Sequence, residues 1–146
     1  ERLREIVARH GIELVLDVHG MAPERDLGMA LGTMRGRSCP GHRDAIIRAL
    51  SAHGFRSDAE GPNGLDSLDY LDVDETFTGA GLGDQETVTS FAWRELRVSC
   101  AQIELHPALR VVERRKDATL PMPYRGDSER IRRVVDALVE IVGSVS

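Results

Sequence analysis

The segment 12–19, IELVLDVH, decides the fold of this sequence. It is short, largely apolar and rich in β-branched residues, which is typical of a strand buried on both faces of a sheet. The strand ends with Asp17 and His19, and Gly20 follows. Ligands bind at the carboxyl ends of strands in α/β sheets, so we expect Asp17 and His19 to lie in a ligand-binding or catalytic site.

Further strands and helices are predicted on both sides of this segment. The expected strands span residues 29–33, 69–73 and 97–105, and the expected helices span residues 1–10, 43–52 and 128–142. Residues 87–96 are ambiguous between helix and strand. The last helix is predicted to bury a stripe formed by Ile131, Val134, Val135, Leu138, Val139 and Ile141. This order of elements predicts an α/β domain with helices covering a sheet.

Composition narrows the class of protein. The 146 residues suffice for one domain, and 19 Lys and Arg against 24 Asp and Glu give a net charge of −5. That balance argues against nucleic acid as the main partner, because phosphate binding needs a concentrated positive field. No apolar run approaches the roughly 20 residues of a membrane span. We therefore expect a cytoplasmic protein with no membrane partner, in which Cys39 and Cys100 are reduced and packed.

Two side chains are candidates for metal chemistry. His19 is a frequent type of zinc ligand, and Asp17 points to the same side of the strand, where it can orient the imidazole. A structural histidine hydrogen-bonded to Asp17 is the alternative. Glu104 is predicted to be buried, because it lies between Ile103 and Leu105 in a strand. It is either a base beside a metal-bound water or the ion-pair partner of an arginine.

Other candidates lie in the predicted loops. Arg25, Arg37 and Arg110 follow predicted strands, where a guanidinium can clamp a substrate carboxylate. The glycine-rich segment 77–83, FTGAGLG, lacks the spacing of a nucleotide-binding loop and is interpreted as a lid or cleft wall. Cys39 belongs to no known nucleophile motif. A hydrolase that uses Cys39 or a serine remains an alternative.

Several short motifs occur in a characteristic order. They are LDVHGM at 16–21, RDL at 25–27, LGT at 31–33, GRS at 36–38 and QIEL at 102–105, with Arg110 six residues after Glu104. In residues 12–50 and 98–110 the sequence resembles the N-formylglutamate amidohydrolase family, which is similar in fold to the zinc carboxypeptidases and aspartoacylases. The resemblance implies a three-layer α/β/α domain around a mixed central sheet.

The resemblance also implies an activity, that of a zinc-dependent amidohydrolase that cleaves an N-acyl amino acid such as formylglutamate. His19 would bind Zn²⁺ with Asp17 behind it, Glu104 would be the base, and Arg37 or Arg110 would hold the substrate carboxylate. The family's two other zinc ligands precede the Asp-x-His strand, and only 16 residues do so here. Residues 1–146 are therefore expected to be the C-terminal part of a longer catalytic domain. A non-catalytic ligand-binding or interaction domain is the alternative.

Overall fold

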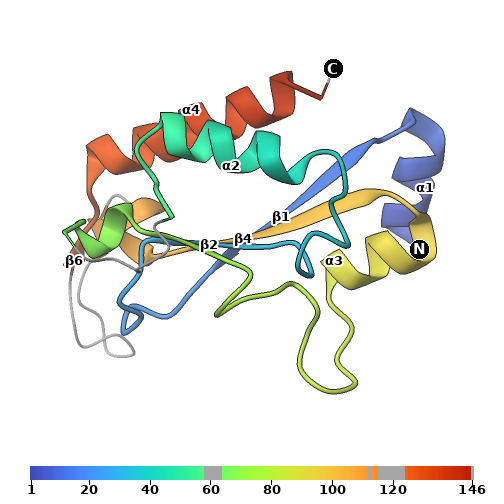
Figure 1. The fold of residues 1–146 in the computed structure, drawn as a ribbon, viewed down its shortest axis with the longest axis horizontal. Helices are drawn as coiled ribbons and strands as arrows, with labels where there is room; N and C mark the ends of the chain where they lie inside the picture. The colour runs from blue at the N-terminus through green and yellow to red at the C-terminus, as the bar shows by residue number, and fades with distance from the viewer. Residues whose placement is uncertain (58–63, 112, 115–123, 146) are drawn as a thin grey trace.

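A computed structural model describes residues 1–57, 64–111, 113–114 and 124–145 of the chain. Its main sheet has four strands in the order β1-β4-β2-β3 (Figure 1). These strands are β1 (Leu14–Gly20), β2 (Met29–Gly32), β3 (Leu71–Val73) and β4 (Ser99–Leu105). β1 and β4 run parallel, as do β2 and β3, while β2 and β4 run antiparallel. The mixed central sheet that the family resemblance implied is confirmed.

Helices lie on both faces of this sheet. They are α1 (Arg2–His10), α2 (Arg43–Ala52), α3 (Val88–Phe91) and α4 (Ser128–Gly143). α2 and α4 lie side by side over one face (Figure 1). α3 continues into a π-helical stretch, Ala92–Leu96. It packs against β4 on the opposite face of the sheet from α2 and α4, where Thr89 contacts Cys100. The ambiguous segment 87–96 is thus helical. A second sheet pairs β5 (Glu113–Arg114) with β6 (Tyr124–Arg125).

The hydrophobic core lies between the sheet and the α2–α4 layer. Alternate strand residues such as Leu31 and Ile103 meet Leu50 of α2 and Val134 of α4. Burying such side chains stabilises the fold by about 1.5–3 kcal/mol each. We call this side of the sheet the helix-covered face. No helix within the described residues has both the length and the apolar character to cross a membrane.

The two cysteines are free and fully buried, as predicted. Burial raises the pKa of the Cys39 thiol to about 12 and that of the Cys100 thiol to about 11. A thiolate is the nucleophilic form of cysteine, and it is scarce at such pKa values. The structure therefore gives no support to Cys39 as a nucleophile.

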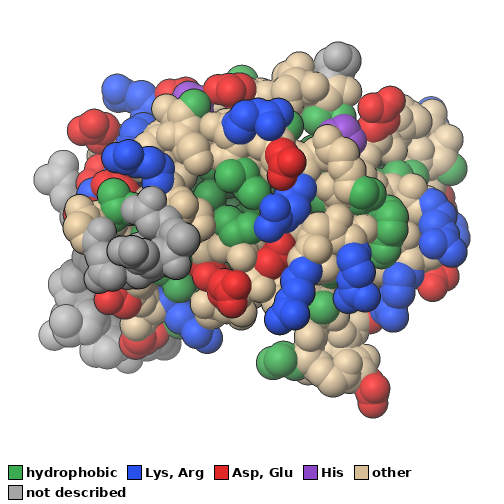
Figure 2. All heavy atoms as spheres, viewed as in Figure 1, with side chains coloured by type: hydrophobic (Ala, Val, Ile, Leu, Met, Phe, Trp, Pro, Cys, Tyr) green, Lys and Arg blue, Asp and Glu red, His purple; other side chains and the backbone are tan. Residues whose placement is uncertain are grey.

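An ion-pair cluster fixes the start of α4. Asp127 caps the helix by accepting hydrogen bonds from the backbone N–H groups of Glu129 and Arg130. Arg130 Nε donates to Asp69 Oδ1 at 2.8 Å, and Arg133 Nη2 donates to the same oxygen at 2.6 Å. Hydrogen bonds from Arg130, then from Arg133, lower the pKa of Asp69 to about 2. Elsewhere, basic and acidic side chains are interspersed on the surface that Figure 2 shows.

Two expectations about burial are wrong. β1 is only partly buried, and its Val18 is 48% exposed, because β1 is the edge strand of the described sheet. On α4, Val135 and Val139 are 52% and 66% exposed, although the stripe prediction buried both. The core includes Val134, Ala137 and Ile141 of α4. Nothing in the described residues covers Val135 and Val139.

Candidate active site

His19 and Glu104 become neighbours because β1 and β4 run side by side. The register pairs Asp17 with Gln102 and His19 with Glu104. Residues paired in register project from the same face of a sheet, and so do residues two apart in one strand. Ile103, between the two β4 residues, points into the core under α2 and α4. The four polar side chains therefore share the opposite face, which we call the polar face.

Asp17 holds the imidazole of His19. His19 Nε2 lies 2.8 Å from Asp17 Oδ1, so the predicted contact is present. A carboxylate only accepts hydrogen bonds, so beside an ionised Asp17 the Nε2 atom carries a proton; in a neutral ring Nδ1 then keeps its lone pair. The side chain of His19 is 47% exposed and that of Asp17 only 14%. A histidine fixed in this way is typical of a metal ligand, and also of a structural histidine at a strand end.

Glu104 is a buried carboxylate with a neutral partner. It is 6% exposed, and Gln102 Nε2 donates a hydrogen bond of 2.7 Å to its Oε1. No cation is paired with Glu104 in the hydrogen bonds and ion pairs of the described residues, so the alternative of an arginine partner finds no support there. A buried charge that lacks a cation costs stability, which favours a role in binding or catalysis. The Gln102 partner follows from the two-residue spacing in a strand.

The glycine-rich segment forms a wall on the polar face. A Cβ atom on Gly32 of β2 would lie 2.6 Å from the backbone oxygen of Phe77 and 2.7 Å from the nitrogen of Gly79, so only glycine permits this approach. The backbone N–H of Met34 donates to the Thr78 oxygen at 2.6 Å. Gly32 pairs with Gln102 across β2 and β4, so the wall stands beside the polar cluster.

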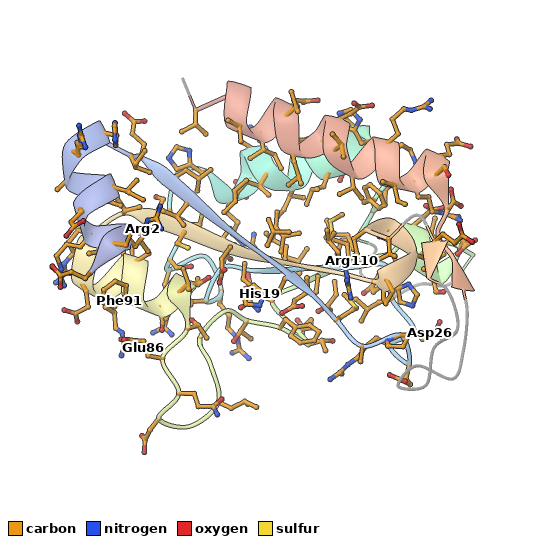
Figure 3. All side chains as sticks on the ribbon, turned by 180° about the vertical axis from the view of Figure 1, so that it is seen from behind. Arg2, His19, Asp26, Glu86, Phe91 and Arg110 are labelled. Carbon is orange, nitrogen blue, oxygen red and sulfur yellow. The ribbon has the colours of Figure 1, made fainter. Side chains whose placement is uncertain are left out.

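Of the two arginines predicted to hold a substrate, one lies toward the other end of the strands and one on the helix-covered face. Arg37 follows β2, and because β2 runs antiparallel to β4 this turn lies toward the amino ends of β1 and β4. Arg110 packs against Gly20, where a Cβ atom would lie 2.5 Å from its guanidinium carbon. Gly20 pairs with Leu105 and so faces the helix-covered side. Figure 3 shows His19 and Arg110 on opposite sides of β1.

A third arginine, Arg25, does approach the polar face. It belongs to the loop after β1, and its guanidinium carbon lies 5.1 Å from the centre of the Phe77 ring. The backbone of Phe77 rests on Gly32, so this stacking brings Arg25 to the wall of the site. Its position after the predicted strand had marked it as one of three candidates. Only the folded loop after β1 shows that Arg25, and not Arg37 or Arg110, approaches the polar face.

The described residues do not complete a zinc site. Among them, no group of three His, Cys, Asp or Glu side chains is arranged to hold a metal ion. A catalytic zinc needs three protein ligands and an open position. His19, with Nδ1 free to bind a metal, fits one ligand position, and Glu104 is its neighbour in register. His106 adds none, because its Nδ1 accepts from the Ala108 N–H at 3.1 Å and its Nε2 lies 3.2 Å from the Pro23 oxygen.

Comparisons with known proteins bear on this geometry. No protein-family model and no curated protein matches the sequence. A solved structure does match, that of N-formylglutamate amidohydrolase from Ralstonia eutropha JMP134, with a TM-score of 0.54 and 17% sequence identity. This chain has a fold similar to that enzyme's. The match covers 95% of this chain and 45% of the enzyme, so the chain spans less than half of its length. At this identity the likeness concerns the fold.

Proposed function

We propose that this chain is part of a zinc-dependent amidohydrolase that cleaves an N-acyl amino acid of the formylglutamate type. The observation that carries the proposal is the register of β1 and β4, which places His19 beside Glu104 on the polar face. The similarity in fold to an N-formylglutamate amidohydrolase supports it. The remaining zinc ligands would come from outside the described residues.

In this proposal each side chain has a distinct task. His19 would hold a zinc ion through Nδ1, while Asp17 fixes the ring from the other nitrogen. A zinc ion bound there would supply a water of lowered pKa and a Lewis acid for the amide carbonyl. Glu104 accepts the proton of the attacking water and passes it to the leaving amine nitrogen as the C–N bond breaks. Gln102 holds Oε1 of Glu104, which leaves Oε2 for the proton.

The substrate carboxylate needs a cation on the same face. We assign this task to Arg25, because its contact with Phe77 brings it to the wall of the site. Arg37 and Arg110 are less suited, because Arg37 lies toward the other end of the strands and Arg110 lies on the other face. A guanidinium binds a carboxylate through two parallel hydrogen bonds, which would fix the scissile amide in place.

Zinc titration of the full-length protein, followed by NMR of the histidine ring nitrogens, tests the proposal. We expect the Nδ1 resonance of His19 to shift on zinc addition, and His19→Ala to weaken zinc binding by at least about tenfold. His53→Ala is the matched control, because His53 also contacts a carboxylate, that of Glu140 at 2.9 Å, away from the polar face. Unchanged zinc binding in His19→Ala, or equal losses in both variants, would contradict the proposal.

A non-catalytic ligand-binding or interaction domain is the second candidate. The lack of a three-residue metal group among the described residues favours it. Such a domain would bind a carboxylate ligand at Arg25 without any requirement for zinc. Binding of N-formylglutamate that is unaffected by a chelator and by His19→Ala would favour this candidate over the enzyme.

A further inference from the structure

Asp72 of β3 also lies on the polar face. The register pairs Asp72 with Ala30 of β2; Ala30 pairs with Glu104 of β4, which in turn pairs with His19 of β1. Residues paired in register project from the same face of a sheet. Leu71, the preceding residue of β3, belongs to the core on the other face. One row of the sheet therefore runs from His19 through Glu104 and Ala30 to Asp72.

Asp72 is a second buried carboxylate without a cation. It is 4% exposed, and the backbone N–H of Thr76 donates a hydrogen bond of 2.8 Å to its Oδ2. Its Oδ1 has no partner among the described residues. In that part of the chain, Arg133 Nε is the one side-chain nitrogen or oxygen that is fully enclosed and lacks a partner, so Oδ1 of Asp72 is accessible to solvent. Thr76 thus satisfies one oxygen, and the other is available to a ligand.

The wall of the site connects Asp72 with Arg25. Thr76, which donates to Asp72, directly precedes Phe77, and the guanidinium carbon of Arg25 lies 5.1 Å from the centre of the Phe77 ring. A carboxylate and a guanidinium therefore adjoin the same wall of the polar face. An α-amino acid carries an ammonium and a carboxylate on one carbon atom, so it can form a charged hydrogen bond with each of them.

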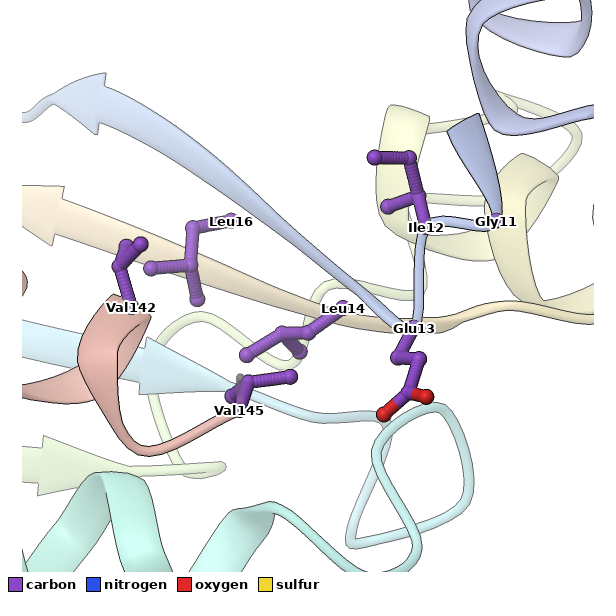
Figure 4. A pocket seen from close by; sticks show the side chains of 7 residues that line it. All are labelled: Gly11, Ile12, Glu13, Leu14, Leu16, Val142 and Val145. Carbon is purple, nitrogen blue, oxygen red and sulfur yellow. The ribbon is translucent and has the colours of Figure 1, made fainter. Parts of the chain in front are cut away.

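A hollow on the helix-covered face does not offer this combination. It has a volume of about 280 Å³ and lies between β1 and the end of α4 (Figure 4). Among the described residues that line it, Glu13 carries the only charge, and the others are glycine or apolar residues such as Leu14 and Leu16. That lining holds no cation for the carboxylate of an amino acid. The polar face is therefore the better site for such a ligand.

Glu104 lies on the other side of Ala30 from Asp72. Neighbouring strands are roughly 4.8 Å apart, so the backbones of the two acidic residues are separated by roughly 10 Å. Ala30 contributes only a methyl group, so no long side chain of β2 stands between the two carboxylates. We propose that Asp72 binds the nitrogen atom of the scissile amide and, after cleavage, the ammonium of the released amino acid. This inference rests on the proposed function.

Hydrolysis changes the charge of this nitrogen. In the N-acyl substrate it is a neutral amide N–H. When the C–N bond breaks, the nitrogen keeps the electron pair and takes the proton that Glu104 received from water. A second proton comes from the new carboxylic acid and completes the ammonium. Hydrogen bonds between charged groups are stronger than those of neutral groups, so Asp72 stabilises the developing ammonium more than the bound substrate.

Calorimetric binding to the full-length protein tests this role without turnover. L-Glutamate is the released amino acid, and glutarate has the same carbon chain and both carboxylates but no amine. We expect L-glutamate to bind at least about tenfold more tightly than glutarate. Asp72→Asn keeps an oxygen for the Thr76 N–H and removes the charge. It should weaken L-glutamate binding by at least about tenfold and leave glutarate binding within about twofold.

Kinetics and a matched variant complete the test. For N-formylglutamate, Asp72→Asn should lower kcat by at least about tenfold and leave KM nearly unchanged, because the substrate nitrogen is neutral. Asp66→Asn is the control and should change neither binding nor turnover. Asp66 Oδ1 also accepts a backbone N–H, that of Leu68 at 3.0 Å, but its Oδ2 contacts Arg130 of α4, away from the polar face.

Three binding results would overturn this inference. They are equal affinities of the unmodified protein for L-glutamate and glutarate, an unchanged affinity of Asp72→Asn for L-glutamate, and an equal loss of both ligands in that variant, which would indicate a structural role. Failure of the proposed function looks different, because the unmodified protein would then not hydrolyse N-formylglutamate, whatever its preference between the two ligands. Failure of this inference alone would leave hydrolysis and its dependence on Glu104 intact.

Discussion

The two faces of β4 differ in how the burial of their side chains affects stability. Ala101, Ile103 and Leu105 enter the core under α2 and α4, whereas Gln102 and Glu104 lie on the polar face. Both sets are almost inaccessible to solvent. Apolar side chains gain free energy from burial, while a carboxylate without a cation loses it. Alternate residues of one strand thus stabilise the fold on one face and hold a buried carboxylate, which costs stability, on the other.

The sharpest test of this contrast is Glu104→Gln. If Glu104 is the base, we expect hydrolysis of N-formylglutamate to fall by about 10²–10⁴-fold, because general base catalysis contributes about that much. Zinc should stay bound, and the urea midpoint should not fall, because a buried charge is removed. Glu140→Gln is the control, on an exposed glutamate that contacts His53. Full turnover in Glu104→Gln would remove Glu104 from the mechanism.

On the helix-covered face, Ile103→Ala should lower stability, which Glu104→Gln is expected to leave intact. The free energy of unfolding should fall by about 2–5 kcal/mol, because the substitution opens a cavity in the core. Val18→Ala, on an exposed valine of the neighbouring strand, should cost much less. Urea titration measures both. If the two losses are equal, the core does not lie where the structure places it.

A smaller effect is expected at the ion pairs that hold α4 over this face. The pKa of Asp69 is lowered to about 2, so its contribution to stability is present above the unfolded pKa near 3.8 and is lost as pH falls through 2. Asp69→Asn should therefore cost about 2 kcal/mol at pH 7 and almost nothing near pH 2.

Urea unfolding at both pH values measures this difference. Asp44→Asn is the matched control, because Asp44 is 82% exposed and lies 3.8 Å from Arg43. A cost for Asp69→Asn that does not change with pH would show that the ionised carboxylate is not what stabilises α4.

Local patterns in the sequence predict much of the fold and part of the site. Apolar, β-branched runs predict β1 and β4, and the two-residue spacing predicts the contact of Asp17 with His19. Which arginine shares the face of His19 could not be predicted in this way. Arg25 and Arg37 both follow strands in the chain, but β2 runs antiparallel to β4, and strand direction depends on long-range pairing.

By itself, the sequence determined the positions of the main strands and helices and the residues with chemical potential, because hydrophobic periodicity and strand alternation are local. Only the tertiary structure decided that His19 pairs in register with Glu104, that the backbone of Phe77 covers Gly32, and that β1 and the outer valines of α4 stay exposed. These features depend on contacts between distant segments. No local pattern encodes which edge of a sheet is left open.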